Sequence, residues 1–388
     1  MTQSKFAFID QTLAERERSG RLRALKGLSP LPGARVRVKG RVLDNFSSND
    51  YLGLSMHPLL RERAIEYTER YGAGAAASRL ICGTMDCCLA LESKLADLKG
   101  TEAALIFNSG YQANVSLLPA LADRRSLILS DRLNHNSLIK GAMLSRCRVI
   151  PFRHNDTDHL KKLLEENMDK GYSRLIVVTE SVFSMDGDCA DLGALSELAQ
   201  DFGAWLMVDE AHAMGVMGKR GMGLACGKKV DLAMGTFGKA GGSFGAYAAC
   251  SRKVRDYLVN CCSGFIYSTG LPPAVLGTID AALDLIPGLD EERTLLQFRA
   301  DRLRATLNAG GFNTGDSVTQ IIPVILGDEG GTVSLSKKLE ENGILATAIR
   351  PPTVPSGGSR IRLSLSAAHT RDQLERLTDA FFGAKDTK

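Results

Sequence analysis

The chain has 388 residues, of which 44% are hydrophobic and 24% are charged, as in an ordinary globular protein. A single hydrophobic core rarely serves more than about 300 residues, so a chain of this length can form two cores. Its 48 basic and 44 acidic residues give a formal charge of +4 without a run of like charge, which excludes the electrostatic footprint of a nucleic-acid-binding surface. Residues 1–13 lack the apolar core of a signal peptide, and no stretch approaches 18 apolar residues, so we expect a cytoplasmic protein without a membrane segment.

The nine cysteines are scattered along the chain, and none stands in the C-x-x-C spacing of zinc and redox sites. Their odd number also argues against a complete disulfide framework. We therefore expect reduced cysteines that fill apolar space, and no metal site.

The N-terminal segment is predicted to form an arm over residues 1–45. Residues 6–25 show helical periodicity with charged faces, and a break rich in Pro and Gly follows at residues 30–33. Residues 35–43 then alternate between polar and apolar types around a Lys-Gly turn, which is typical of a β-hairpin.

Residues 46–280 are predicted to form a large α/β domain. Short apolar runs alternate there with helical stretches or loops, at residues 103–107, 127–130, 149–152, 175–179, 205–209, 232–236 and 245–250. Seven such runs predict a mostly parallel sheet that is covered by helices on both faces.

Residues 281–388 are predicted to form a smaller α+β domain. A helical connector follows Pro272 and Pro273 and reaches about residue 303. Three strands are expected after it, at residues 321–326, 344–349 and 360–365, with helices between and after them.

Polar residues follow several strands of the large domain, at residues 109–111, 131–135, 180–186, 209–212 and 236–239. Ligands of open α/β sheets bind beyond the carboxyl ends of the strands. We therefore expect these segments to converge on one cleft.

Lys239 is the most informative residue of this cleft, since it lies among glycines and downstream of Asp209 and His212. A lysine amine can form a Schiff base with the aldehyde of pyridoxal phosphate. A carboxylate can keep the pyridine nitrogen protonated, and an imidazole can hydrogen-bond the phenolic oxygen. The pattern favours this chemistry; the simplest alternative is a solvated lysine in a surface turn.

Three other motifs point to different classes of protein. The segment Asp209–His212 resembles the acidic box of helicase-type NTPases, but no Gly-Lys pair is followed by the Ser or Thr of a phosphate loop. Ser243 stands in a G-x-S-x-G motif of serine hydrolases, but a predicted strand follows where a hydrolase has a helix. The segment Gly72–Ala77 fits a loose dinucleotide-binding pattern, but it follows a helical run.

Several further segments resemble the α-oxoamine synthase family of fold-type I pyridoxal phosphate enzymes, and the resemblance covers nearly the entire chain. They are Phe46–Leu54, Val182–Asp188, Ala348–Pro355, Arg360–Leu363 and Ala367–His369. The resemblance implies the fold of a fold-type I transferase, pyridoxal 5'-phosphate as cofactor, and a homodimer with the active site at the subunit interface.

The resemblance also assigns roles around the cofactor ring. Lys239 would be the Schiff-base lysine and the base that removes the α-proton of the substrate. Asp209 would pair with the pyridine nitrogen. His212 would contact the phenolic oxygen with Ser184 nearby. His135 would stack on the ring and assist either the attack on the thioester or the reprotonation.

Residues for the cofactor phosphate are implied in the same way. They are the backbone N–H groups of Gly110 and Tyr111, the Thr236 hydroxyl and, across the dimer interface, Ser268 and Thr269. A helix that starts after Gly110 would add its positive end to this anion site.

On the substrate side, the resemblance implies that Arg362 and Asn49 bind the amino-acid carboxylate. Arg23 would meet the far carboxylate of a dicarboxylic acyl chain, and Thr353 is assigned to the substrate site with it. The implied reaction is a decarboxylative condensation of L-alanine with a pimeloyl thioester of coenzyme A or of an acyl-carrier protein.

Members of the family that use glycine or serine are the nearest alternative, because a pocket distinguishes a methyl or hydroxyl group by only about 1–3 kcal/mol. A serine hydrolase built on Ser243 and a non-catalytic interaction protein are the alternatives from other classes. Residues 74–79 and 240–242 depart from the family pattern without touching a proposed catalytic group. Outside the site, we expect Arg360 to face solvent, and His57, His154 and His159 to be structural or surface residues.

Overall fold

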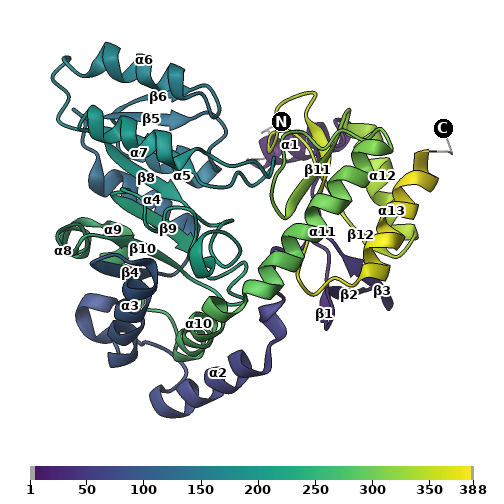
Figure 1. Cartoon of the computed structure of the whole chain (residues 1–388), viewed down its shortest axis with the longest axis horizontal. Helices are drawn as coiled ribbons and strands as arrows, with labels where there is room; N and C mark the ends of the chain where they lie inside the picture. The colour runs from purple at the N-terminus through teal and green to yellow at the C-terminus, as the bar shows by residue number, and fades with distance from the viewer. Residues whose placement is uncertain (1–4, 386–388) are drawn as a thin grey trace. The chain divides into compact units, whose positions relative to one another are not determined.

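The structure, a computed structural model, describes residues 5–385; the first four residues of the predicted arm and the last three of the predicted C-terminal domain lie outside it. The described chain forms two compact units (Figure 1). The large unit comprises residues 49–184 and 188–296, and the small unit comprises residues 5–48, 185–187 and 297–385. The three-part division predicted with boundaries near residues 45 and 280 remains a prediction.

The large unit contains a seven-stranded sheet in the order β4-β10-β9-β8-β7-β5-β6. Its strands are β4 (Ala103–Phe107), β5 (Leu127–Asp131), β6 (Arg148–Phe152), β7 (Leu175–Glu180), β8 (Trp205–Asp209), β9 (Leu232–Thr236) and β10 (Ala246–Cys250). Only β10 runs antiparallel to its neighbours. The predicted seven-stranded, mostly parallel sheet is confirmed.

Helices precede, separate and follow these strands along the chain (Figure 1). They are α2 (Pro58–Tyr71), α3 (Asp86–Lys99), α4 (Gly110–Leu121), α5 (Asn136–Leu144), α6 (Thr157–Asn167), α7 (Leu192–Asp201), α8 (Arg252–Cys261), α9 (Ser263–Ile266) and α10 (Pro273–Leu285). Shorter turns occur at Leu54–Met56, Arg79–Gly83, Lys219–Gly221 and Ile286–Gly288. No helix follows Ser243 directly, because β10 comes next, so the setting of a serine-hydrolase nucleophile is missing.

Two hydrophobic cores lie on opposite faces of the sheet. On β7, Ile176 and Val178 belong to one core and Val177 to the other, as the alternation of side chains along a strand requires. The first core includes residues of α4, α5 and α8, and the second includes residues of α6 and α7. Burial of each large apolar side chain contributes roughly 1.5–3 kcal/mol, so the sheet is stable only with both faces covered.

Side-chain caps fix where two helices of the large unit begin. The Ser109 hydroxyl accepts a hydrogen bond from the N–H of Gln112 at the start of α4. The His135 imidazole accepts one from the N–H of Ser137 at the start of α5. Such caps satisfy N–H groups that have no partner inside the helix. Both helices therefore begin just beyond the carboxyl ends of β4 and β5.

The small unit contains two small sheets and several helices. Its strands are β1 (Ser29–Leu31), β2 (Arg35–Val38), β3 (Arg41–Asn45) and β12 (Ile344–Leu345) in one sheet, and β11 (Ile321–Gly327), β14 (Ser359–Ser364) and β13 (Thr347–Ile349) in the other. Its helices are α1 (Ala7–Arg18), α12 (Glu329–Glu341), α13 (Arg371–Lys385) and the larger part of α11 (Asp290–Ala309), which begins in the large unit.

Three predictions for the small unit were wrong in detail. The helix predicted over residues 6–25 ends at Arg18, and Gly20 then has φ +65°, which leaves the helical region. The strand predicted over residues 344–349 is divided, because β12 pairs with β3 whereas β13 pairs with β14. Arg360 is buried and lies 2.6 Å from the Asp186 carboxylate, since alternation along a strand does not reveal which face is covered.

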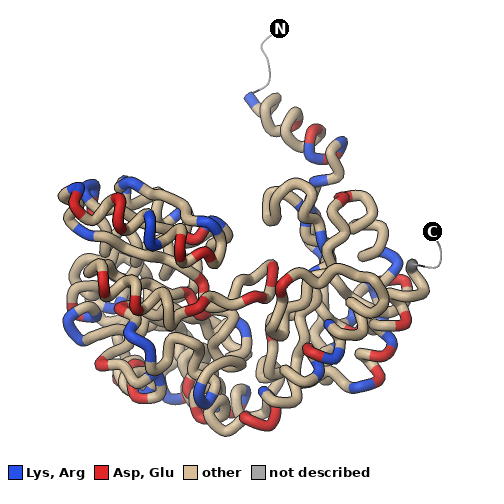
Figure 2. Tube along the Cα trace, turned by 45° about the horizontal axis from the view of Figure 1, so that its top comes forward, with Lys and Arg blue, Asp and Glu red and all other residues tan. Residues whose placement is uncertain are grey.

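Charged residues of both signs are interspersed along the chain, as Figure 2 shows. Within residues 5–385, no helix is at once long enough and apolar enough to cross a bilayer. The same part of the chain contains no cluster of three or more His, Cys, Asp or Glu side chains suited to a metal ion.

Candidate active site

A cavity of about 200 Å³ lies in the large unit, where β7, β8 and β9 end. It is lined by Gly110, Tyr111, Asn114, His135, Ser137, Glu180, Asp209, Ala211, His212, Met234, Thr236 and Lys239. Each of the five polar segments that the sequence placed beyond strand ends contributes at least one of these residues. The arrangement follows from parallel strands, whose carboxyl ends meet at one edge of the sheet.

Lys239 lies in the turn between β9 and β10. Its Nζ is 2.7 Å from Nε2 of His212, and Nδ1 of His212 is 2.6 Å from the Tyr51 hydroxyl. The turn also depends on Gly242, which has φ +60° and lies where a Cβ would be 2.4 Å from the backbone nitrogen of Ser55. Only glycine fits this close approach, so the local sequence fixes the position of the lysine.

Asp209 is the last residue of β8, and its side chain is buried. Its Oδ1 accepts a hydrogen bond from the N–H of Ala211, and its Oδ2 accepts one from the amide of Asn114, both at 2.8 Å. Two donors hold the carboxylate in one orientation.

His135 caps α5 and lines the cavity. Its backbone N–H donates to Oε1 of Glu180 at 2.5 Å, and its Nδ1 is 2.7 Å from Oγ of Ser137. Burial lowers the pKa of His135; the charge of Asp209 acts against this shift and the charge of Lys239 adds to it. The imidazole is therefore largely neutral at pH 7.

Glu180 ends β7 within hydrogen-bonding distance of the His135 backbone. Burial raises the pKa of Glu180 well above its usual value, the neighbouring charge of Asp209 adds to the shift, and Lys239 opposes it. The cavity thus holds a carboxyl group with a raised pKa, Glu180, near the Asp209 carboxylate, which accepts two hydrogen bonds.

The N-terminus of α4 provides the anion-binding part of the cavity. Gly110 and Tyr111 are its first residues, and a Cβ on Gly110 would lie 3.8 Å from Cβ of Thr236. The Thr236 hydroxyl donates to the carbonyl of Gly245 at 2.8 Å and accepts from the N–H of Gly238 at 3.1 Å. Backbone N–H groups at a helix start, together with the helix dipole, favour a phosphate.

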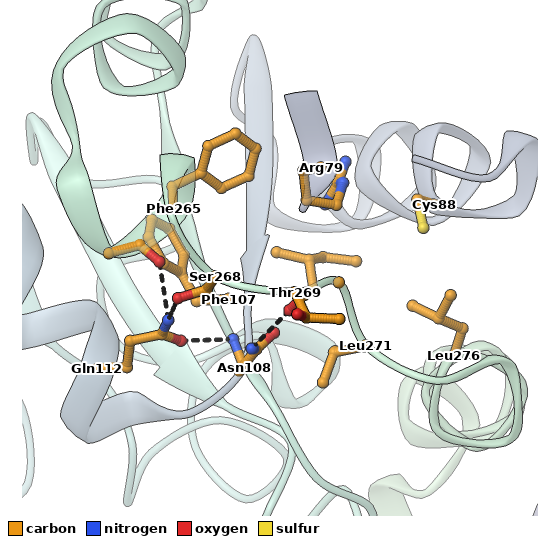
Figure 3. Close-up of a pocket in the computed structure, with 13 residues that line it drawn as sticks. Arg79, Cys88, Phe107, Asn108, Gln112, Phe265, Ser268, Thr269, Leu271 and Leu276 are labelled. Carbon is orange, nitrogen blue, oxygen red and sulfur yellow. Dashed lines mark hydrogen bonds between the residues drawn. The ribbon is translucent and has the colours of Figure 1, made fainter. Parts of the chain in front are cut away.

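Ser268 and Thr269 lie in a second, smaller pocket of the large unit and do not line the first cavity (Figure 3). The Gln112 amide donates to the Ser268 hydroxyl at 2.5 Å, and the Asn108 amide donates to the carbonyl of Thr269 at 2.8 Å. Both contacts belong to the residues around the start of α4. A role for this pair at a phosphate across a dimer interface remains a proposal.

The remaining predicted site residues do not line the cavity. Ser184 is buried in the segment that follows β7, and Oδ1 of Asn49 is 3.0 Å from the Tyr51 hydroxyl. The other three belong to the small unit. There, the Arg23 guanidinium donates to the Thr353 hydroxyl at 3.3 Å, and Arg362 of β14 is buried. Their roles toward substrate stay predictions.

Sequence reasoning missed Tyr51, Asn114 and Ser137 as individual residues of the site, and it gave Glu180 no role. A signal existed for Asn114, because it stands four residues after Gly110 and so lies on the same face of α4. Tyr51 stands inside a segment that carries the family resemblance. Ser137 shows no comparable signal, since a serine near a helix start is ordinary capping chemistry.

His154 was expected to be structural or at the surface, and it joins two loops near the cavity. Its Nδ1 is 3.0 Å from Asp131 at the end of β5, and its Nε2 is 2.7 Å from Asp188. Burial opposes the charged imidazolium, but the hydrogen bonds and charges of the two carboxylates outweigh this and raise the pKa of His154 to about 10.

The groups in the cavity fit pyridoxal phosphate. An amine faces the imidazole of His212, a fixed carboxylate lies in Asp209, and a helix start provides N–H groups for a phosphate. In addition, Oδ1 of Asn114 is buried without a hydrogen-bond partner among residues 5–385. Such an acceptor can be satisfied by a bound group or by water.

Comparison with known proteins agrees with this geometry. The model of the family "Aminotransferase class I and II" matches residues 43–381. A relative from Desulfosudis oleivorans, named "Putative 8-amino-7-oxononanoate synthase", is 60% identical over 97% of this chain and 98% of its own length. A relative from Gluconacetobacter diazotrophicus, named "8-amino-7-oxononanoate synthase", is 54% identical over 89% of this chain and 88% of its own.

A solved structure extends the likeness to the fold. A variant of serine palmitoyltransferase from S. paucimobilis, with bound "PLP- Myriocin Aldimine", matches with a TM-score of 0.92 and 27% identity over 100% of this chain and 99% of that chain. The chain therefore belongs to the aminotransferase class I and II family, as a pyridoxal phosphate-dependent α-oxoamine synthase that is similar to 8-amino-7-oxononanoate synthases over nearly its full length.

Proposed function

We propose that the protein is an 8-amino-7-oxononanoate synthase of biotin biosynthesis, which condenses L-alanine with a pimeloyl thioester and releases carbon dioxide and the thiol. The observation that carries the proposal is the 2.7 Å contact between Nζ of Lys239 and His212, in the same cavity as the fixed carboxylate of Asp209. The named relatives at 54–60% identity support the choice of substrates.

Lys239 acts as the base and later as the acid. Pyridoxal phosphate, when bound, supplies an electron sink for the negative charge that forms at the α-carbon of the amino acid. Nζ of Lys239 removes the α-proton, and it must be uncharged to do so. The Nε2 of His212 can accept a hydrogen bond from the amine and so keeps its lone pair directed at the substrate. After carbon dioxide leaves, Lys239 returns a proton to the same carbon.

Asp209 holds a proton at the nitrogen of the cofactor ring. Its carboxylate is the acceptor for that proton, and the charge of the pair strengthens the electron sink. The hydrogen bonds from Asn114 and Ala211 keep the carboxylate from turning away. His212 provides the contact to the phenolic oxygen, with Ser184 near it.

The backbone N–H groups of Gly110 and Tyr111 and the hydroxyl of Thr236 would hold the cofactor phosphate. In a cytoplasmic homodimer, Ser268 and Thr269 of the partner subunit complete this site.

Arg362 and Asn49 would bind the carboxylate of L-alanine and so fix the orientation of the amino acid. Arg23, which donates to Thr353 at 3.3 Å, lies in the arm that would meet the far carboxylate of the pimeloyl chain. The acyl carrier is coenzyme A or an acyl-carrier protein.

A second candidate is a member of the same family that uses serine or glycine. The match to serine palmitoyltransferase at a TM-score of 0.92 favours this candidate, whereas sequence identity to that protein is only 27%. The amino acids differ by one methyl or hydroxyl group, which a pocket distinguishes by about 1–3 kcal/mol.

Turnover distinguishes the candidates. The purified holoenzyme is supplied with L-alanine, glycine or L-serine, together with pimeloyl-CoA or the pimeloyl-carrier protein, and release of thiol and carbon dioxide is measured. The proposal predicts the highest kcat/KM with L-alanine. Preferred turnover of glycine or serine would assign the protein to the second candidate, and no turnover with any of the three would overturn both.

A further inference from the structure

A continuous set of hydrogen bonds connects Asp209 with His135, and its donors can be assigned one by one. The carboxylate of Asp209 only accepts, so the group of Asn114 that lies 2.8 Å from Oδ2 is the amide nitrogen. The same nitrogen is 2.9 Å from Oγ of Ser137 and donates its second proton there. The orientation of the Asn114 amide is thus determined by its partners.

Ser137 then has one assignment that satisfies all its contacts. Its Oγ accepts from Asn114, so its single hydroxyl proton is available for Nδ1 of His135 at 2.7 Å. The backbone N–H of Ser137 also points at Nδ1, at 3.3 Å, and a backbone N–H can only donate. Two donors therefore meet at Nδ1 of His135, which cannot carry a proton itself.

We infer that Asn114 and Ser137 are positioning residues that hold His135 as the neutral tautomer with its proton on Nε2. The backbone of His135 is fixed independently, through its N–H bond to Glu180. Burial of the ring, which lowers the pKa of His135, acts in the same direction by disfavouring the imidazolium.

The tautomer decides what His135 can do in the reaction, and this part of the inference rests on the proposed function. A ring with Nδ1 occupied by two donors does not take up a proton there without losing both bonds. Its Nε2–H remains a hydrogen-bond donor that can stabilise charge developing on the thioester oxygen. His135 is then a donor and not a proton carrier, which leaves the return of the proton to Lys239.

The tautomer can be measured directly, without substrate. Holoenzyme labelled with ¹⁵N-histidine gives distinct nitrogen shifts for protonated and unprotonated ring nitrogens, and the signals of His135 are identified by their loss in His135→Gln. We expect a protonated Nε2 and an unprotonated Nδ1 at pH 7–8. A protonated Nδ1 in the native enzyme would overturn the inference.

Variants separate positioning from a merely structural role. Ser137→Ala removes one of the two donors to Nδ1, so the His135 ring should take up a proton more readily. We expect kcat to fall about 3- to 10-fold and the acid limb of the kcat/KM profile to move to higher pH. Ser137→Thr keeps the hydroxyl and should restore the native profile. Asn114→Leu removes the donor that orients the Ser137 hydroxyl proton toward Nδ1, so this proton can turn away and the fraction of the Nδ1-protonated tautomer should rise.

Ser145→Ala is the matched control, because Ser145 is a buried serine next to the other end of α5 whose hydroxyl donates to the carbonyl of Ala142. It should leave the shifts of His135 and the pH profile unchanged, and thermal unfolding shows whether each variant is folded. A Ser137→Ala profile that superimposes on the native profile contradicts the inference. The nitrogen shifts of His135 in the native enzyme decide the tautomer even if a variant fails to fold. If the predicted tautomer is present but L-alanine is not turned over, only the proposed function is contradicted.

Discussion

Lys99 and Glu210 form a fully buried ion pair directly beside Asp209 in sequence. The Lys99 amine is 2.5 Å from Oε2 of Glu210 and donates to the carbonyl of Met222 at 2.6 Å. The other oxygen of Glu210 accepts from the N–H of Ala225 at 2.7 Å. Burial opposes the charge of Lys99, but Glu210 outweighs it and raises the pKa of the amine. The ion pair therefore fixes the backbone between Asp209 and His212.

Removal of one partner should leave an uncompensated buried charge. For Lys99→Met we predict a loss of about 3–5 kcal/mol in the free energy of unfolding, measured by urea denaturation. The double variant Lys99→Met with Glu210→Leu should recover most of this loss, because it removes both charges. A loss below about 1 kcal/mol for Lys99→Met would contradict this account of the pair.

The residue types of Lys239, Asp209 and His212 were sufficient to predict the cofactor chemistry, because each group has a distinct reaction to perform. The residues that position them could not be predicted as readily. Ser137 and Glu210 have ordinary types for their places in a helix start and after a strand, and their contacts come from segments far apart in the chain. Only tertiary structure brings these groups together.

At the scale of elements, His154 joins the carboxyl end of β5 to the loop that contains Asp188. The pKa of His154 is raised from 6.5 to about 10 by its two carboxylate partners. When the pKa of a group is higher in the folded protein than in the unfolded protein, its protonation stabilises the fold fully below the unfolded-state pKa. This stabilisation is lost as the pH rises through the folded-state pKa. The bridge therefore stabilises the fold most at or below pH 6.5 and loses this effect toward pH 10.

We predict that the free energy of unfolding falls between pH 7 and pH 9.5, by an amount bounded above by about 3 kcal/mol and reduced by partial exposure of the ring. In His154→Gln, the protein should be less stable at pH 7 and its stability should depend less on pH. Urea denaturation at the two pH values measures this difference. His159→Gln is the control, since the His159 imidazole accepts a hydrogen bond from the backbone N–H of Arg153. If the free energy of unfolding of His154→Gln and of His159→Gln depends equally on pH, the stabilising role of the His154 bridge is refuted.

The strands of the large sheet could be predicted from the sequence because each is a short, predominantly apolar run bounded by helices or polar loops. In the small unit the same method was less successful. The run at residues 344–349 has the composition of one strand, yet its first residues pair with β3 and its last with β14. Pairing partners are a tertiary property, and a continuous apolar run does not encode where it changes sheet.

At the scale of the whole molecule, the proposed homodimer makes a prediction about mixed subunits. One chain carries Lys239→Ala, and the other carries Ser268→Ala with Thr269→Ala. If Ser268 and Thr269 serve the cofactor phosphate of the partner subunit, a mixed dimer contains one complete site. A mixed dimer should have about one half of the native activity, because one of its two sites is intact. An equal mixture of the two chains, of which about half assembles as mixed dimers, should have about one quarter of the native activity.

The two parental homodimers supply the controls, because each lacks one component at both sites. Denaturing and refolding an equal mixture allows subunits to exchange before the assay. No gain of activity over the parents, with mixed dimers detected by native mass spectrometry, would mean that the pair does not act across the interface.

The central claim is that the amine of Lys239 is the group that bonds the cofactor. The purified holoenzyme is reduced with borohydride, digested, and analysed by mass spectrometry for peptides that carry the reduced cofactor. We predict loss of the visible absorption band and modification of Lys239 alone, with neither effect in Lys239→Ala. Modification of another lysine, or a protein that binds no pyridoxal phosphate, would contradict the account.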